Sequence, residues 1–321
     1  MSSLFSSILS ADFVYMWIRV ATPLIFSALG AVICDRAGVV NLGLEGIMLC
    51  AALFGVLGSA LGGSVWWGLL AGVGISVILS LVFAYFHLNL KANNVLCGTA
   101  VNTFASGFTV FVLDLITGEK GTSASLKSFS FPAVDIPVLK NIPVIGKILS
   151  GHNLLTYLAI LSVFGCMYFL YKTPLGLRIR SVGENPNAAA SVGISVIKMR
   201  YIAIVLCGVL TGLGGMYLSM GYLNIFARDM VAGRGFIALA ASAMGRGTPM
   251  GAFLSALIFA FFDGLSNILQ LLRIPAEFVQ MLPYAATILG LTVYSIQRAA
   301  AERKKTGQPA RRQAKITQEA G

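Results

Sequence analysis

Long runs of apolar residues, separated by short polar stretches, make up most of this chain. A run of roughly 17 to 25 apolar residues is long enough to cross the hydrocarbon core of a bilayer as a helix. A helix satisfies its backbone polar groups internally, which is required inside lipid. The pattern therefore predicts an all-α, polytopic transmembrane helical bundle. The long runs are 15–34, 46–63, 65–86, 94–117, 153–171, 201–221, 250–269 and 279–297, and a shorter run is 235–245.

The composition supports a membrane protein and excludes an ordinary soluble domain. Charged residues make up 11% of the chain, against about a quarter of a typical soluble domain. Apolar residues make up 57%, and the mean hydropathy is +0.84. No polar stretch is long enough to carry a core of its own. Residues 1–297 are therefore expected to form a single transmembrane domain, followed by a basic tail, 298–321.

Most of the positive charge lies in two segments. The first, 172–200, which we call the basic island, has five Lys or Arg residues against one acidic residue, Glu184. The second, the tail 298–321, has seven Lys or Arg residues against two acidic ones. Their balances, +4 and +5, account for most of the net charge of +11. The rest of the chain is nearly neutral.

Lys and Arg next to membrane spans mark the cytoplasmic side, so the basic island and the C-terminal tail are expected there. Two segments on the same side are separated by an even number of crossings. Three long runs lie between the basic island and the tail (201–221, 250–269 and 279–297), so the short run 235–245 must be a fourth crossing. The loop 118–152 then lies outside and 87–93 inside. Two alternatives stay open for the N-terminus. Nine spans place it outside, whereas a broken helix around Asp35–Glu45 gives ten and places it inside.

The extracytoplasmic loop 118–152 contains Pro132, Pro137 and Pro143, which argue against a continuous helix. The loop is either a docking surface for an extracytoplasmic partner or an ordinary connection between spans. The basic residues on the opposite side suit anionic membrane lipids. Because juxtamembrane Lys and Arg are the expected topology signal, we predict no nucleic-acid partner.

Small residues recur at a spacing that lets helix backbones approach closely. The pairs, each four residues apart, are Gly58 and Gly62, Gly68 and Gly72, and Gly208 and Gly212. The five cysteines are scattered through apolar runs without metal-binding spacing, so neither a metal site nor a disulfide is expected. His87 and His152 lie at the ends of runs, where a solvated structural role is expected.

The chain carries no sequence signature of an enzyme. It contains no GxxxxGK[ST] phosphate loop, no HExxH and no GxSxG, and nothing resembles a nucleophile with its base. We therefore expect no catalytic residues and no cofactor. If the protein works against a gradient, the energy must come from a partner or from an ion gradient.

Few ionisable residues lie inside the apolar runs, where they are costly and usually functional. Asp263 lies in the middle of a run and should face the bundle interior, bonded to a neighbour such as Asn267 or exposed to a cavity. Glu45 follows Asn41 closely, and the glycines around it suggest a broken helix. Two further ionisable residues lie near run ends, Arg19 and Asp114.

Amide side chains form a second polar set. Asn94 and Asn102 can share one face of the run that begins near them. Amides bind neutral polar solutes without the desolvation cost of a charge, which suits a path for a sugar or nucleoside better than one for an ion. Alternatively, these amides only bond another helix. The candidates for the substrate path are Asn41, Glu45, Asn94, Asn102, Asp263 and Asn267.

The basic island contains a signal for a short helix. Asn185 followed by Pro186 predicts a helix start, because Asn caps helices and Pro fits the first helical position. Three alanines propagate the helix, and Gly193 can end it. A helix of about two turns is marginal alone. It must therefore pack on its own bundle or insert into the groove of a partner.

Three sequence blocks, in order along the chain, resemble the permease subunits of bacterial ABC importers for nucleosides and simple sugars. The resemblance extends from about Thr22 to Tyr294, and the first and last blocks look most like the nucleoside branch. The blocks are DRAGVVNLGLEGIML (35–49), TPLGLRIRSVGENPNAAASVGI (173–194) and AGRGFIALAASAMGRGTPMGAFLSALIFAFFDG (232–264).

The resemblance implies an inner-membrane permease of eight to ten spans that hydrolyses no ATP itself. Its implied partners are cytosolic ABC ATPase subunits, a second permease subunit that is expected to be a paralogue, and an extracytoplasmic substrate-binding lipoprotein. One departure from the family is the Gly247–Thr248 pair, where bulkier residues are frequent. The family's ATPase-coupling segment falls on Gly183, Glu184, Asn185, Pro186, Asn187 and Ala188.

The expected function is therefore a translocation path for nucleosides, driven by ATP in a partner subunit. A permease for ribose-like sugars is the first alternative. An ion-coupled secondary transporter is the second, and the scarcity of acidic residues inside the apolar runs disfavours it.

Overall fold

The computed structural model describes residues 10–135 and 150–269, together with a few isolated positions between 146 and 148 and between 285 and 296. Within these residues, seven helices are long and apolar enough to cross a membrane. The strands found there form one short antiparallel pair. The predicted all-α transmembrane bundle is thus confirmed. The expected span 279–297 and the tail 298–321 lie outside the continuously described stretches.

The helices follow the predicted apolar runs closely. Their bounds are α2 (Ala11–Arg36), α3 (Leu44–Gly62), α4 (Val65–Ala84), α5 (Asn94–Thr117), α8 (Leu154–Lys172), α9 (Pro174–Glu184), α10 (Pro186–Ser191), α11 (Val196–Tyr217), α12 (Arg234–Met244) and α13 (Pro249–Leu269). Short π-helical turns extend α4 and α11, at Tyr85–Asn89 and Leu218–Tyr222. The strands are β1 (Ala133–Val134) and β2 (His152–Asn153).

Three helices form the centre of the bundle. The most apolar stretch of α2 is 83% buried, that of α3 is 72% buried and that of α11 is 67% buried, whereas α4, α5 and α8 are buried to only about a third. The predicted glycine pairs lie at the contacts between α3, α4 and α11. A methyl group on Gly208 would meet Ser80 of α4, and one on Gly72 would meet Met216 of α11. The expected close packing through small residues is confirmed.

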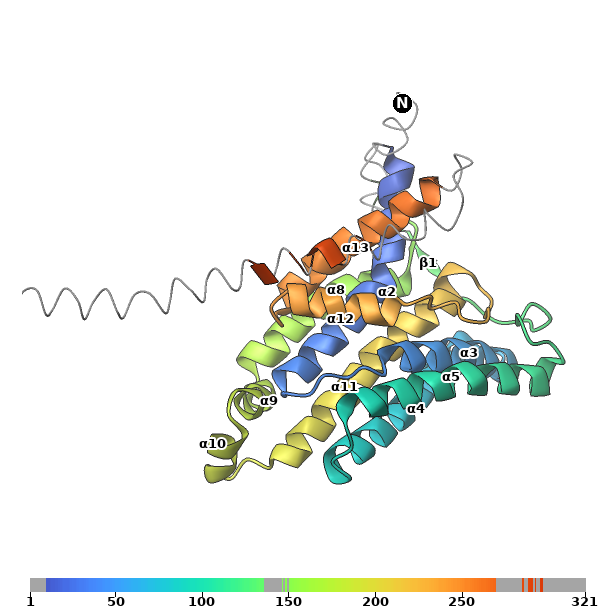
Figure 1. The fold of residues 1–321 in the computed structure, drawn as a ribbon. Helices are drawn as coiled ribbons and strands as arrows, with labels where there is room; N and C mark the ends of the chain where they lie inside the picture. The colour runs from blue at the N-terminus through green and yellow to red at the C-terminus, as the bar shows by residue number, and fades with distance from the viewer. Residues whose placement is uncertain are drawn as a thin grey trace, which may run out of the picture.

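The bundle has two distinct ends (Figure 1). We call the end that holds α9 and α10 the island end, and the end that holds residues 118–135 the loop end. At the loop end, the chain segment 121–131 packs along the segment 220–228. The backbone N–H of Arg228 donates to the Gly121 carbonyl at 2.8 Å, and that of Ser123 donates to the Phe226 carbonyl at 2.9 Å. No helix forms in the described stretch 118–135, which contains Pro132, whereas Pro137 and Pro143 lie outside the described residues.

The first turns of α2 lie at the loop end. The Tyr15 hydroxyl donates to the Gly151 carbonyl at 2.9 Å, and its ring stacks on His152 with the centroids 4.2 Å apart. The helix ends at Arg36, beside Gly183 at the island end. The start of α2 therefore lies at the end of the bundle opposite the basic island. The seven residues between α2 and α3 connect two separate helices, so the break there adds no crossing.

His152 has a different environment from the one predicted. Its side chain is buried, with 2% of its surface exposed, and its Nε2 lies 2.7 Å from the Ile148 carbonyl oxygen. Burial lowers the pKa of His152, and the nearby Arg19 lowers it further, while the Ile148 hydrogen bond raises it. The expectation of a solvated role was wrong for His152, because Tyr15 stacks on its ring and Tyr157 contacts it edge-on.

We expect Gly208→Ala to destabilise the protein by about 1–3 kcal/mol, because its new methyl group would overlap Ser80 in a tightly packed contact. Gly74→Ala on α4 is the matched control, since a Cβ there meets no atom within 4 Å. Thermal unfolding of the purified protein measures both changes. Equal melting temperatures for the two variants would contradict the packing described here.

Candidate functional site

Helix α3 begins inside the bundle. After α2 ends at Arg36, the chain turns back towards the bundle centre and reaches Asn41, which is fully buried. The side-chain oxygen of Asn41 accepts the Gly43 N–H at 3.0 Å, and its Nδ2 lies 3.8 Å from the Cys207 sulfur in the middle of α11. Asn41 therefore fixes the turn that starts α3 rather than facing an open path.

Asn102 of α5 ties α3 to α5. Its Oδ1 accepts the Gly46 N–H at 2.8 Å, and its Nδ2 donates to the Leu42 carbonyl at 3.0 Å. The first N–H groups of a helix have no partner within the helix, and Asn102 satisfies one of those of α3. The alternative prediction, in which amides bond a neighbouring helix, thus describes the contacts that Asn102 makes.

The Glu45 carboxylate caps the start of α12 from a different helix. Its Oε1 accepts the Gly233 N–H at 2.7 Å, and its Oε2 accepts the Gly235 N–H at 2.8 Å. A carboxylate is favoured at a helix N-terminus, where unpaired N–H groups and the helix dipole give positive potential. Gly235 allows this close contact, because a Cβ there would lie 2.5 Å from the Glu45 nitrogen.

Arg234, between the two glycines that Glu45 binds, forms an ion pair with Asp263. Its guanidinium nitrogen lies 3.0 Å from the Asp263 carboxylate oxygen, and both side chains are about four-fifths buried, with 20% and 18% exposed. Asn267 was the expected bonding neighbour of Asp263, and Arg234 was not predicted in this role. The missed signal was Arg234 itself, which directly precedes a short apolar run.

These contacts form one layer of polar residues, which we call the polar layer: Asn41, Glu45, Asn102, Arg234 and Asp263. The layer lies within the bundle, because Gly46, next to Glu45, packs against Val101 in the third turn of α5. From there α12 runs 11 residues to the island end. At ~1.5 Å per residue it covers only about half of a ~30 Å hydrocarbon core.

The other two path candidates lie away from the polar layer. Asn94 begins α5, at the end of that helix near the island end, and its Oδ1 is buried without a hydrogen-bond partner in the described residues. Asn267 lies one turn beyond Asp263 on α13 and is half-buried. The structure therefore brings four of the six candidates together.

One face of α5 presents hydroxyl groups within the apolar region. Thr99 and Thr103 are exposed one turn apart. Ser106 follows in the next turn, and its hydroxyl lies 3.4 Å from the Asp229 carboxylate oxygen. The Thr99 hydroxyl itself donates to the Val95 carbonyl at 2.9 Å. Because the same face leads to the Asp229 carboxylate, it suits a polar path or a partner subunit better than lipid.

The short helix predicted in the basic island is confirmed as α10. The Asn185 side chain accepts the Ala188 N–H at 3.0 Å, Pro186 occupies the first helical position, and Gly193 follows the helix with a positive φ of 83°. Ala189 is buried against the bundle, whereas Asn187 and Ala188 are exposed. The predicted coupling residues therefore lie at the α9–α10 corner, with most of them facing outward.

Gly183 has a structural role at this corner. It packs against the backbone of Arg36 and Gly38, where α2 ends. The Arg36 guanidinium in turn donates to the carbonyls of Gly247 and Arg246, just after α12. Gly247, where the family often has a bulkier residue, therefore contacts Arg36 through its backbone carbonyl.

A second contact joins the ends of α2 and α12. The Ser242 hydroxyl donates to the Asp35 carboxylate at 2.6 Å. The island end therefore connects α10, α9, α2 and α12 through direct contacts, and α12 reaches the polar layer. Within the described ranges, no group of three His, Cys, Asp or Glu side chains could hold a metal ion.

Comparison with known proteins shows the family of this chain. The family model described as the branched-chain amino acid transport system permease component matches residues 13–291. The guanosine ABC transporter permease protein NupQ of Bacillus subtilis is 42% identical over 89% of this chain and 91% of its own. The nucleoside ABC transporter permease protein NupC of Lactococcus lactis is 38% identical over 85% of this chain and 89% of its own.

More distant similarity extends to other permeases and to a solved structure. The nucleoside ABC transporter permease protein NupB of Lactococcus lactis is 25% identical over 82% of this chain and 74% of its own. PsaBC from Streptococcus pneumoniae, solved in complex with Fab, shares the fold with a TM-score of 0.53 at 12% identity, covering 90% of this chain and 94% of that one. The chain therefore belongs to the branched-chain amino acid transport system permease component family of membrane proteins.

Proposed function

We propose that this chain is the membrane-spanning permease subunit of an ATP-driven nucleoside importer. The observation that carries the proposal is its 42% identity to a guanosine ABC transporter permease over nearly the whole length of both chains. The bundle supplies what such a subunit needs: seven membrane-length helices in the described residues, a buried polar layer and an outward-facing short helix at one end. A ribose-like sugar stays an alternative, since a glucose permease of Haloferax volcanii is 24% identical.

The proposed path follows the hydroxyl-bearing face of α5 towards the polar layer. Thr103 offers a hydroxyl donor and acceptor for a neutral, polar solute, and Thr99 offers a hydroxyl oxygen as an acceptor. Asn94 adds an amide whose buried oxygen has no partner among the described residues. Such groups bind nucleosides without requiring a charged partner. Because this face of α5 is open in a single chain, a second permease would close the path from the other side.

The proposed partners follow from the same arrangement. A second permease fits the pair of different permease proteins, NupB and NupC, that resemble this chain in one organism. ATP hydrolysis is assigned to separate cytosolic ATPase subunits, which would dock on α10. A substrate-binding lipoprotein would meet the loop end. In this orientation the protein lies in the bacterial inner membrane with its C-terminus in the cytoplasm.

Motion at the island end can reach the polar layer through direct contacts. A partner that moves α10 also moves α9, and Gly183 of α9 rests on Arg36 of α2. Arg36 and Asp35 hold the far end of α12. Since the start of α12 is bonded to Glu45 of α3, a tilt of this half-length helix would open or close the polar layer. We therefore assign α12 as the gate of the path.

Proteoliposomes that contain the assembled importer are expected to accumulate guanosine when ATP is supplied to the ATPase side. Ribose at the same concentration should be accumulated much less, because the path and the relatives favour nucleosides. Uptake of both labelled substrates, with and without ATP, is the measurement. Guanosine uptake that persists without ATP but collapses with an ionophore would show an ion-driven carrier instead, and preferred uptake of ribose would favour the sugar alternative.

The variants Glu184→Arg and Pro186→Gly are expected to abolish uptake while ATP hydrolysis by the complex continues. Glu184 is an exposed residue of the α9–α10 corner, and Pro186 preorganises the start of a six-residue helix. Lys198→Glu is the control, because it reverses an exposed charge on the same side but outside both helices. Normal uptake by both corner variants would refute the coupling assignment.

A further inference from the structure

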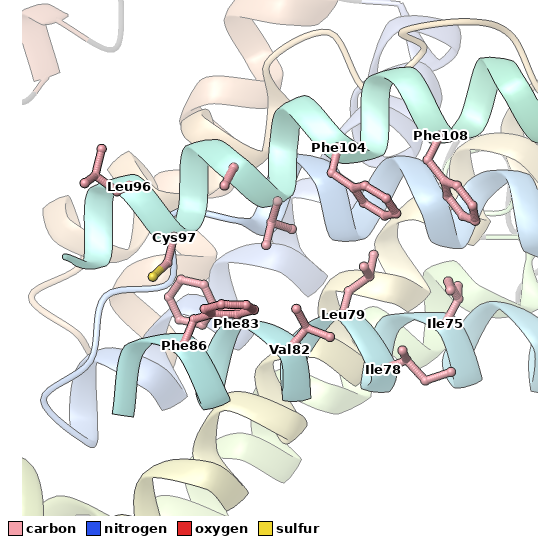
Figure 2. Close-up of a pocket in the computed structure, with 12 residues that line it drawn as sticks. Ile75, Ile78, Leu79, Val82, Phe83, Phe86, Leu96, Cys97, Phe104 and Phe108 are labelled. Atoms are coloured by element: carbon pink, nitrogen blue, oxygen red, sulfur yellow. The ribbon is translucent and has the colours of Figure 1, made fainter. Parts of the chain in front are cut away.

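An apolar groove lies between α4 and α5 on the outside of the bundle (Figure 2). It has a volume of about 600 Å³. All twelve residues that line it are apolar, and they come from 75–86 of α4 and its π-helical turn, and from 96–108 of α5. Because no lining side chain offers a strong hydrogen bond, the groove does not suit a nucleoside and is separate from the proposed path.

The groove opens on a surface that faces lipid. Large aromatic side chains are exposed at both ends of α4: Trp66 (64%) and Trp67 at the loop end, and Tyr85 (51%) at the island end. Exposed Trp and Tyr residues mark the two membrane interfaces of a span. Trp67 and Tyr85 are 18 residues apart and so lie on the same side of the helix, and the rise between them is about 27 Å, which matches a hydrocarbon core of ~30 Å. The exposed face of α4 therefore spans the bilayer.

The groove ends beside a positive charge. Its α4 wall lies in the half of the helix nearer the island end, and Phe86 and Leu96 lie at its end close to the α4–α5 connection (Figure 2). That connection carries Lys91, which is exposed. A hydrogen bond of 2.6 Å from the Tyr201 hydroxyl to Asn89 fixes the connection against α11. A charged group therefore lies at the membrane interface, next to the end of an apolar groove.

We propose that the groove binds an acyl chain of an anionic phospholipid, with the head group held at Lys91. The groove is elongated along the two helices, as an extended hydrocarbon chain is, and its lining matches the chemistry of such a chain. The ammonium group of Lys91 selects an anionic head group over a zwitterionic one.

The position of the groove on α5 argues for lipid over a second permease. Ala100 and Phe104 line the groove, whereas the exposed Thr99 and Thr103 each lie one residue earlier and so point about 100° away around the helix. The polar face is the one that suits a path or a partner subunit. The groove-lining face of α5 is wholly apolar, and exposed aromatic residues lie at both ends of the neighbouring α4. This face therefore suits lipid.

The test places a fluorophore in the groove of the assembled importer in lipid vesicles. Phe86→Trp keeps an aromatic side chain in the lining, and the signal of the unsubstituted complex, with its native tryptophans, is subtracted. The probes are brominated phosphatidylglycerol and brominated phosphatidylcholine, which quench a nearby indole. We expect quenching at position 86 with about fivefold preference for the phosphatidylglycerol, the effect of one Lys near an anionic lipid.

Lys91→Gln in the Phe86→Trp background should remove this preference while quenching itself remains. The control is Lys120→Gln, because Lys120 is an exposed Lys at the opposite end of the bundle and should leave the preference unchanged. Equal quenching by the two lipids in the Phe86→Trp variant with Lys91 intact would overturn the proposed head-group site. Absence of quenching by either lipid in the assembled importer would show that protein covers the groove, which would also overturn the proposal.

Discussion

The two hydrogen bonds from the start of α12 to the Glu45 carboxylate are the constraint on which the rest of the structure depends. A helix that begins within a membrane bundle exposes N–H groups that lipid cannot satisfy. Glu45 satisfies those of Gly233 and Gly235, and its negative charge complements the helix dipole. Because α12 is thereby fixed at mid-bundle, Arg234 is placed within reach of Asp263, and a half-length helix becomes stable.

The same constraint connects the polar layer to the basic island, the two regions that we propose take part in transport. One end of α12 rests on Glu45, and the other is held through Asp35 and Arg36 at the end of α2. The same end of α2 packs against Gly183 of α9, and α9 is followed directly by α10. We propose that this short helix, bonded at both ends, tilts as a unit and so transmits a displacement of the basic island to the polar layer.

The sequence predicted the elements well, because apolar runs and the Asn185–Pro186 cap are local signals. It predicted the polar layer only in part. Asn41, Glu45 and Asp263 stood out as polar residues in apolar surroundings, but their partners are distant in sequence: Glu45 bonds residues almost two hundred positions away. His152 was misjudged for the same reason, since its burial depends on Tyr15, and no local pattern indicates that contact.

The central claim is that Glu45 holds α12 as a moving gate. The most direct measurement is the labelling rate of a thiol on α12, with Phe236→Cys, in the assembled importer with and without ATP. Phe236 is 49% exposed, and the native cysteines are buried. The labelling rate should depend on ATP when Glu45 is present and lose that dependence in Glu45→Gln, because Gln replaces one of the two acceptor oxygens with an NH2 group and removes the charge. The same ATP dependence in both backgrounds would contradict the account.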